Sequence, residues 1–132
     1  MAGNTDMVTF IEARLAEEEQ VACNAGGANW RCPADAPGEV HDRTSGIAFT
    51  VRGANYDQHI ALHDPARALA RLETNRVLLG EYLDVADRDV DRPADDFASG
   101  RAVGLGFAVR QLAAEYAWHP GYKAKWLPRF TR

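Results

Sequence analysis

The 132-residue sequence has only two cysteines, Cys23 and Cys32, and its longest apolar run covers just residues 102–109. A run of this length is too short to span a bilayer. Near the start of the chain, acidic Asp6 stands where a signal peptide needs a basic segment followed by an apolar one. We therefore expect a cytoplasmic protein with no membrane partner, in which both cysteines are free thiols.

Several functional signatures are missing as well. The sequence contains no Gly-x-Ser-x-Gly element, no phosphate-binding loop and no dinucleotide fingerprint, which disfavours the enzyme classes built on them. Fifteen basic and nineteen acidic residues give a formal net charge of -4, so nucleic acid is not expected as a partner. Neither cysteine has a neighbouring feature that would lower its pKa, so a thiol nucleophile is disfavoured.

The apolar residues that are present repeat mainly with a helical period. Between residues 29 and 53 this period is lost, and glycine, proline and β-branched residues predict a small antiparallel sheet of two to three strands. The other predicted elements are helices at 6–22, 55–62, 65–83 and 98–118, an acidic solvated loop at 84–96 and an extended tail at 119–132. The sequence thus predicts a single α+β domain over residues 1–132, with three main helices packed against the sheet.

The clearest helix start is the Asp64-Pro65 pair. Asp64 can cap the helix, because its carboxylate accepts a hydrogen bond from an otherwise unpaired backbone N–H, and Pro65 suits the first helical position. The apolar arc that follows is predicted to be buried. It consists of Leu69, Leu72, Leu79 and Leu83.

Three charged residues fall inside apolar arcs: Arg14 and Glu18 in the first helix, and Arg76 in the 65–83 helix. If these faces pack together, Glu18 could bridge Arg14 and Arg76, because a buried charge needs a partner. One interpretation is a structural ion-pair network. The other is an anion-binding pocket, since guanidinium groups bind phosphate and carboxylate. The candidate ligand-binding residues are Arg14, Glu18, Arg67 and Arg76.

A metal site is the rival interpretation. His59 and His63 are four residues apart, the spacing of paired histidine ligands on a helix, although Ile60 stands where a zinc protease motif has glutamate. His119 and Asp64 are the candidates for further ligands, and zinc is the expected divalent ion. The alternative is that these histidines only complete a helix junction.

Two smaller patterns lie in the second half of the chain. Asp87, Asp89 and Asp91 have the spacing of a calcium loop, but Arg92 replaces the glycine that such a loop needs. Gly104 and Gly106 interrupt the last predicted helix at a cost in helix propensity, which suggests close approach of a neighbouring element.

Three segments carry a resemblance. Residues 10–22 (Phe-Ile-Glu-Ala-Arg-Leu-Ala-Glu-Glu-Glu-Gln-Val-Ala), 59–69 (His-Ile-Ala-Leu-His-Asp-Pro-Ala-Arg-Ala-Leu) and 116–126 (Tyr-Ala-Trp-His-Pro-Gly-Tyr-Lys-Ala-Lys-Trp) resemble signature blocks of small uncharacterised proteins from actinobacteria and their phages. The resemblance implies no reaction. It implies that certain polar residues belong to family motifs, namely His59, His63, Asp64, Arg67 and His119.

Two functions follow as expectations. The first is a non-enzymatic accessory protein that binds a protein partner or an anionic small ligand, in a phage-related setting. The second is a metal-dependent hydrolase, in which imidazoles hold a divalent ion and a carboxylate orients the attacking water.

Overall fold

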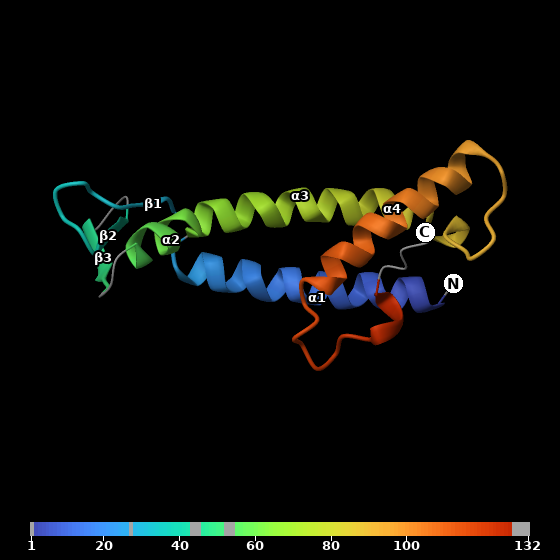
Figure 1. The fold of residues 1–132 in the computed structure, drawn as a ribbon, viewed down its shortest axis with the longest axis horizontal. Helices are drawn as coiled ribbons and strands as arrows, with labels where there is room; N and C mark the ends of the chain where they lie inside the picture. The colour runs from blue at the N-terminus through green and yellow to red at the C-terminus, as the bar shows by residue number, and fades with distance from the viewer. Residues whose placement is uncertain (1, 27, 43–45, 52–54, 128–132) are drawn as a thin grey trace. The chain divides into compact units, whose positions relative to one another are not determined.

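The computed structural model describes residues 2–26, 28–42, 46–51 and 55–127. Within these residues, four α-helices and a three-stranded antiparallel sheet confirm the α+β class (Figure 1). The chain divides into two compact units. Unit 1 consists of residues 1–16 and 74–132, and unit 2 consists of residues 17–73. The single domain expected over the whole chain stays a prediction.

The two long helices contribute residues to both units. Helix α1 covers Ala2–Asn24 and so begins earlier than the predicted 6–22, while α3 covers Pro65–Leu83, the predicted range. The N-cap prediction is confirmed, because the Asp64 carboxylate accepts a 2.8 Å hydrogen bond from the Arg67 backbone N–H. The local sequence at this helix start therefore determines its first residue.

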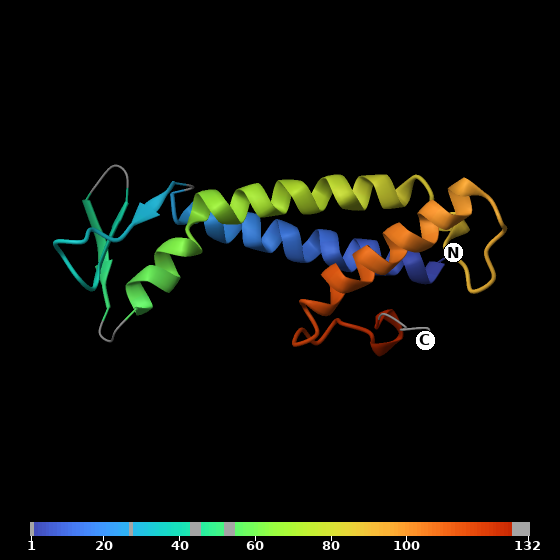
Figure 2. The same cartoon turned by 45° about the horizontal axis from the view of Figure 1, so that its top comes forward.

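The sheet and the short helix α2 lie in unit 2. Strands β1 (Trp30–Arg31), β2 (Glu39–Asp42) and β3 (Gly46–Thr50) pair antiparallel in that order. Helix α2 (Tyr56–Leu62) lies beside β1 and β2 (Figure 2). All three strands lie within the stretch 29–53 for which the sheet was predicted, and residues 43–45, 52 and 53 of that stretch lie outside the described residues.

Gly38 makes the entry into β2 possible. Its φ of 84° lies in the left-handed region, and a Cβ at this position would stand 2.9 Å from the Val51 carbonyl oxygen. The Val51 N–H donates to the Gly38 carbonyl oxygen at 2.8 Å, and the Gly38 N–H donates to the Asp57 carboxylate at 3.1 Å. The close approach of three chain segments therefore requires glycine here.

In unit 1 the elements observed in the second half of the chain differ from the predicted ones in three places. The segment 84–96 is not a purely solvated loop, because it contains the 3-10 helix η1 (Ala86–Arg88) and buries Val85 and Asp89. The last helix, α4, covers Phe97–Ala114 and ends before the predicted residue 118. The tail is not extended throughout, since a second 3-10 helix, η2, covers Ala124–Trp126.

The early end of α4 has a local cause. The N–H groups of Tyr116 and Ala117 donate to carbonyl oxygens three residues back, which tightens the last turn. Pro120 then disfavours the helical conformation of the residue before it. The tail folds back onto unit 1, where Trp126 is buried as an anchor, because its large apolar ring leaves water.

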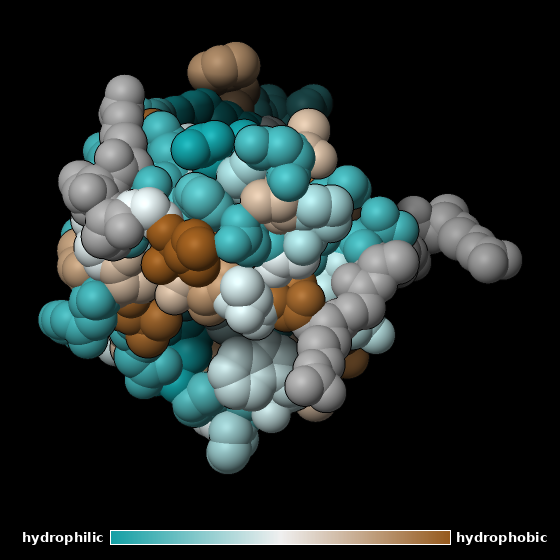
Figure 3. Space-filling view, turned by 90° about the vertical axis from the view of Figure 1, so that its left-hand side faces the viewer, coloured by the Kyte–Doolittle hydropathy of each residue, from teal (hydrophilic) through white to brown (hydrophobic). Residues whose placement is uncertain are grey.

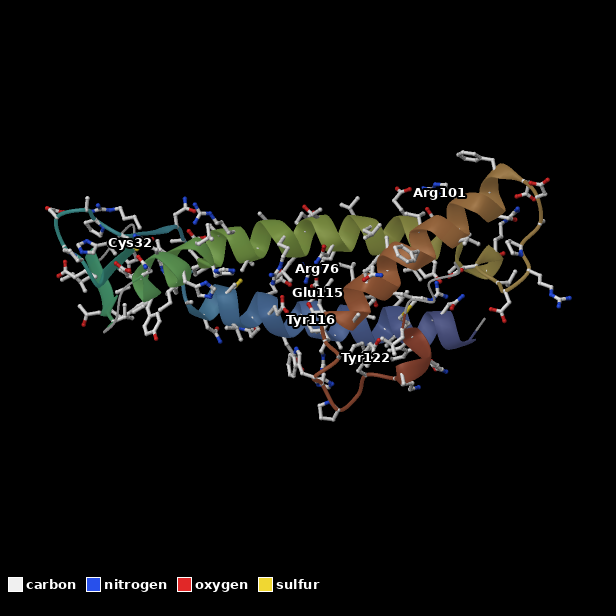
Figure 4. All side chains as sticks on the ribbon, viewed as in Figure 1. Cys32, Arg76, Arg101, Glu115, Tyr116 and Tyr122 are labelled. Atoms are coloured by element: carbon white, nitrogen blue, oxygen red, sulfur yellow. The ribbon has the colours of Figure 1, made fainter. Side chains whose placement is uncertain are left out.

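The core of unit 1 joins residues from α1, α3 and α4. Its buried apolar side chains include Met7, Val8, Ile11, Leu15, Leu79, Tyr82, Ala102, Val109 and Ala113. Tyr116 and Tyr122, labelled in Figure 4, both pack against the Phe10 ring of α1, with ring centroids 6.3 Å apart in each case. The predicted leucine arc is wrong at Leu83, which is 46% exposed.

None of the described helices combines the length and the apolar character needed to cross a membrane.

Candidate functional site

The candidate site in unit 1 begins with a glycine. Gly106 of α4 is buried, and a Cβ at this position would overlap the Asp89 carboxylate and stand 2.8 Å from an Arg110 guanidinium nitrogen. By contrast, a Cβ at Gly104 would meet nothing within 4 Å. The expected close approach is therefore present at Gly106, and its partner is an acidic side chain.

Asp89 is the centre of a buried polar network. The Tyr82 hydroxyl donates to its Oδ2 at 2.6 Å, and the Arg110 guanidinium lies 2.9 Å from the same oxygen. The Asn4 amide donates to the Asp89 backbone carbonyl oxygen at 3.1 Å. A carboxylate that is only 7% exposed would be costly without such partners, so these contacts explain why it is tolerated inside unit 1.

The network determines what Tyr82 can do. Burial raises the pKa of the Tyr82 hydroxyl well above its ordinary value, and the hydrogen bond to Asp89 raises it further, although Arg110 opposes the shift. Tyr82 therefore remains protonated and acts as a hydrogen-bond donor. It does not provide a general base at neutral pH.

A cavity of about 600 Å³ opens beside this network. Its polar lining includes the cationic side chains of Arg92, Arg110 and Lys125, together with Asn4, Asp89 and Asp91. Its apolar part consists of Val90, Val103, Phe107 and Leu127. Since Asp89 is already paired with Tyr82 and Arg110, positive charge is in excess, and the arrangement suits a small ligand with an anionic group and an apolar body.

Arg14 and His119, two predicted site residues, contact each other in unit 1. The Arg14 guanidinium contacts His119 Nε2 and lies over the Phe10 ring, 5.4 Å from its centroid. His119 Nδ1 accepts a hydrogen bond from the Gly121 N–H at 2.9 Å. Both ring nitrogens of His119 thus have protein neighbours, and neither faces an open coordination position.

The other predicted anion-binding residues are distributed over both units. In unit 2, Glu18 pairs with Arg71 at 2.9 Å, while the Arg67 guanidinium donates to the Ala61 carbonyl oxygen at 3.1 Å. In unit 1, Arg76 lines a second cavity of about 360 Å³ together with Glu12. The predicted bridge from Glu18 to Arg14 and Arg76 joins residues of different units and stays a prediction.

The histidine pair lies in unit 2. The rings of His59 and His63 are 4.5 Å apart between centroids, and His63 Nδ1 donates to the His59 carbonyl oxygen at 2.8 Å. This bond leaves Nε2 as the nitrogen of His63 with a lone pair. Asp64 instead uses Oδ1 to cap α3 and Oδ2 to accept the Trp30 N–H at 3.0 Å.

A full metal centre is not assembled in the described part of the chain, where no group of three or more His, Cys, Asp or Glu side chains could hold an ion. Cys32 is not activated either: burial raises the pKa of its thiol, and the negative charge of Asp57 adds to this shift. Cys32 and Cys23 are both free. Zinc binding by His59 and His63 therefore stays a prediction.

The sequence analysis did not identify the residues of the unit 1 cavity as a site. Gly106 and the aspartate run at 87–91 were the available signals, but nothing local indicated that Asp89 would meet side chains from α3 and α4. Asn4 and Lys125 gave no signal, because each is an ordinary polar residue in its own segment.

Residues 4–128 match a family model described as a family of unknown function, DUF6221. Because the match covers almost the whole chain, the protein belongs to this family. No curated protein matches the chain. No solved structure matches it either.

Proposed function

We propose that this DUF6221 member is a non-enzymatic accessory protein that binds an anionic small ligand in the unit 1 cavity. The observation that carries the proposal is the cationic lining of a cavity of about 600 Å³ beside the paired Asp89 carboxylate. This volume lies within the usual range for small-molecule sites, roughly 300–1,000 Å³.

The charge of the cavity supports an anion rather than a cation. Arg110 holds Asp89, so the remaining charged residues of the lining are one acidic residue, Asp91, and two cations, Arg92 and Lys125. A carboxylate or phosphate group would gain charge-assisted hydrogen bonds from these side chains. The apolar body of the ligand would cover Phe107 and Leu127, because both are exposed and covering them removes apolar surface from water.

Thermal unfolding with added anions tests this proposal. Inorganic phosphate, citrate and benzoate serve as probes, since they separate the anionic group from the apolar body. A ligand present at a hundred times its dissociation constant stabilises the folded protein by about 2.7 kcal/mol, so we expect benzoate or a phosphate compound to raise the melting temperature.

Two lysines of the same tail provide a matched pair of variants. Lys125 lines the cavity, whereas Lys123 is paired with Asp6 at 3.6 Å and does not line it. Lys125→Ala should remove most of the shift and Lys123→Ala should retain it. If no anion shifts the melting temperature, or if Arg76→Ala alone removes the shift, the proposed cavity is not the site.

A metal-dependent hydrolase is the second candidate, favoured by the closeness of the His59 and His63 rings and by the hydrogen bond that orients His63. Elemental analysis of the protein purified without added metal tests it. We expect stoichiometric zinc that disappears in the His59→Ala, His63→Ala double variant if this function holds. A metal-free protein whose stability ignores added zinc would contradict it.

A cytoplasmic location and a role in phage infection complete the proposal. The free thiols of Cys23 and Cys32 support the first, because structural disulfides are rare in reducing compartments. Expression of a fluorescent fusion in an actinobacterial host, before and after infection, would test both. A fusion that is exported from the cell contradicts the location, and one whose amount and position ignore infection contradicts the role.

A further inference from the structure

The Asp89 carboxylate keeps one oxygen available in the unit 1 cavity. Its side chain lines the cavity and is only 7% exposed. The Tyr82 hydroxyl and the Arg110 guanidinium both bind the same oxygen, Oδ2, at 2.6 and 2.9 Å. None of the residues that the structure describes donates to the other oxygen, Oδ1. Oδ1 therefore retains its lone pairs for a hydrogen-bond donor that a ligand brings.

Asp91 adds a second carboxylate to the same lining. It is exposed, and it forms no ion pair within the described ranges of the chain. An ammonium group carries three N–H donors and a positive charge, and hydrogen bonds between charged groups are stronger than those between neutral ones. The donor that best suits Asp89 and Asp91 together is therefore an ammonium group.

Arg92 and Lys125 supply the opposite charge. Both line the cavity, and neither is ion-paired with another residue in the described part of the chain. The third cation, Arg110, differs, because its guanidinium is held by Asp89 at 2.9 Å and by the Asn4 side-chain oxygen at 3.5 Å. Arg92 and Lys125 are thus the cations that a carboxylate of the ligand can bind.

An apolar surface completes the lining. It includes Val103, Phe107 and Leu127, which are 38%, 44% and 53% exposed. Covering these side chains with an apolar group removes apolar surface from water and favours binding. The cavity thus combines two carboxylates, two available cations and an apolar wall.

Unit 2 also exposes apolar side chains, but on a mixed surface. Figure 3 shows brown hydrophobic groups among teal hydrophilic ones on the face that it presents. The large exposed apolar residues of this unit include Val21, Ile47, Tyr56 and Leu62. Exposed apolar residues are normal on protein surfaces, so they do not by themselves indicate a ligand.

We propose that the ligand of the unit 1 cavity is a free α-amino acid with an apolar side chain, an inference that rests on the anion binding proposed above. Its ammonium group binds Asp89 Oδ1 and Asp91, and its carboxylate binds Arg92 and Lys125. Asp91 and Arg92 are neighbours in the sequence, as the two charges are neighbours on one carbon of the ligand. A residue at the end of a peptide carries only one of these charges, so the free amino acid is favoured.

Isothermal titration calorimetry with three probes tests the proposal. L-phenylalanine carries both charges and an apolar side chain, hydrocinnamate lacks the ammonium group, and phenethylamine lacks the carboxylate. We expect L-phenylalanine to bind at least about tenfold more tightly than either of the other two, because each of them leaves one set of charges in the cavity without a partner.

Two aspartates of one segment provide matched variants. Asp91 lines the cavity, whereas Asp87 is exposed and does not line it. Asp91→Asn should weaken L-phenylalanine binding at least about fivefold without weakening hydrocinnamate, since only L-phenylalanine carries an ammonium group. Asp87→Asn should change neither affinity by more than about twofold. Lys125→Ala should weaken both probes, because both carry a carboxylate.

The outcomes separate this inference from the function on which it rests. If hydrocinnamate binds as tightly as L-phenylalanine, the amino acid is not the ligand, but the proposed anion binding stands. The inference also fails if Asp91→Asn weakens both probes equally or weakens neither. If L-phenylalanine and hydrocinnamate both fail to bind, the inference and the proposed anion binding fail together.

Discussion

The two units hold their buried carboxylates with different donors. In unit 1, Asp89 is held by the side chains of Tyr82 and Arg110. In unit 2, Asp57 and Asp64 are held by backbone N–H groups, those of Gly38 and Trp30 among them. Where the donors are backbone N–H groups, the position of the carboxylate depends on the local course of the backbone. Where they are side chains, it depends on how the helices that carry them pack.

This difference assigns a role to each unit. In unit 2, the carboxylates of Asp57 and Asp64 accept hydrogen bonds from backbone N–H groups of Gly38 and Trp30 and so join the sheet region to the helices. In unit 1 the buried carboxylate positions a cation, Arg110, at the wall of the cavity. The same residue type is structural in one unit and organises a candidate binding site in the other.

The largest effect should come from adding one methyl group next to the side-chain network. Gly106→Ala places a Cβ against the Asp89 carboxylate and Arg110, which must separate to make room. Disturbing a buried ion pair costs about 3–5 kcal/mol. Denaturant unfolding should show a loss of this order.

Gly104→Ala is the matched control on the same helix. A Cβ there meets nothing within 4 Å, so the variant should gain about 0.5–1 kcal/mol from better helix propensity. A destabilisation of similar size in both variants would show that the close approach at Gly106 is not what holds Asp89.

The corresponding change in unit 2 is Asp64→Ala. It removes the cap of α3 and the acceptor for the Trp30 N–H, and together these should cost about 2–4 kcal/mol. Hydrogen exchange should become faster at the amides of Trp30 and Arg67. Asp64→Asn retains one acceptor oxygen and should lose about half as much stability. Unchanged exchange rates at these two amides in Asp64→Ala would show that the Asp64 carboxylate does not hold them.

The smallest loss of stability is expected for Tyr82→Phe, at about 1–2 kcal/mol near neutral pH, because Arg110 continues to hold Asp89. Its pH dependence is more informative. Since the pKa of Tyr82 is raised in the folded protein, its stabilising contribution is complete below the ordinary value of about 10 and falls as the pH rises above it.

This pH dependence is tested by measuring the unfolding of the wild type and of Tyr82→Phe at neutral pH and again above pH 10. The free energy of unfolding of the wild type should fall towards that of Tyr82→Phe in the alkaline range, where the unfolded chain releases the Tyr82 proton and the folded protein retains it. Parallel pH curves for the two proteins would mean that Tyr82 ionises normally.

The same contrast explains how much of the molecule could be predicted from sequence. The Asp64-Pro65 helix start was predictable because its donor lies three residues away on the same chain segment. The α+β class was predictable because the helical period gives way to β-branched and turn residues between residues 29 and 53. Both predictions depend on contacts that are local in sequence.

The Asp89 network could not be predicted in this way. Arg110 lies on another helix, and the aspartate run around Asp89 is typical of a solvated loop. The prediction that Leu83 is buried is wrong for a related reason. Leu83 lies in the apolar arc, but periodicity does not indicate where along a helix the packing ends. Tertiary packing determines both the partners of Asp89 and the exposure of Leu83.

The order of the units along the chain has a consequence for folding. Unit 2 is one uninterrupted segment, residues 17–73, whereas unit 1 joins residues 1–16 to residues 74–132 across it. Closing unit 1 therefore carries a loop-closure entropy that unit 2 avoids. As the chain leaves the ribosome, unit 2 is complete while α4 is still unsynthesised, so we expect it to fold first.

Until α4 arrives, the apolar stripe of α1 formed by Met7, Ile11 and Leu15 lacks part of its covering. A chaperone that binds the nascent chain would find its target at this stage. We therefore expect the unit 1 cavity to form last, since it requires residues from both ends of the chain.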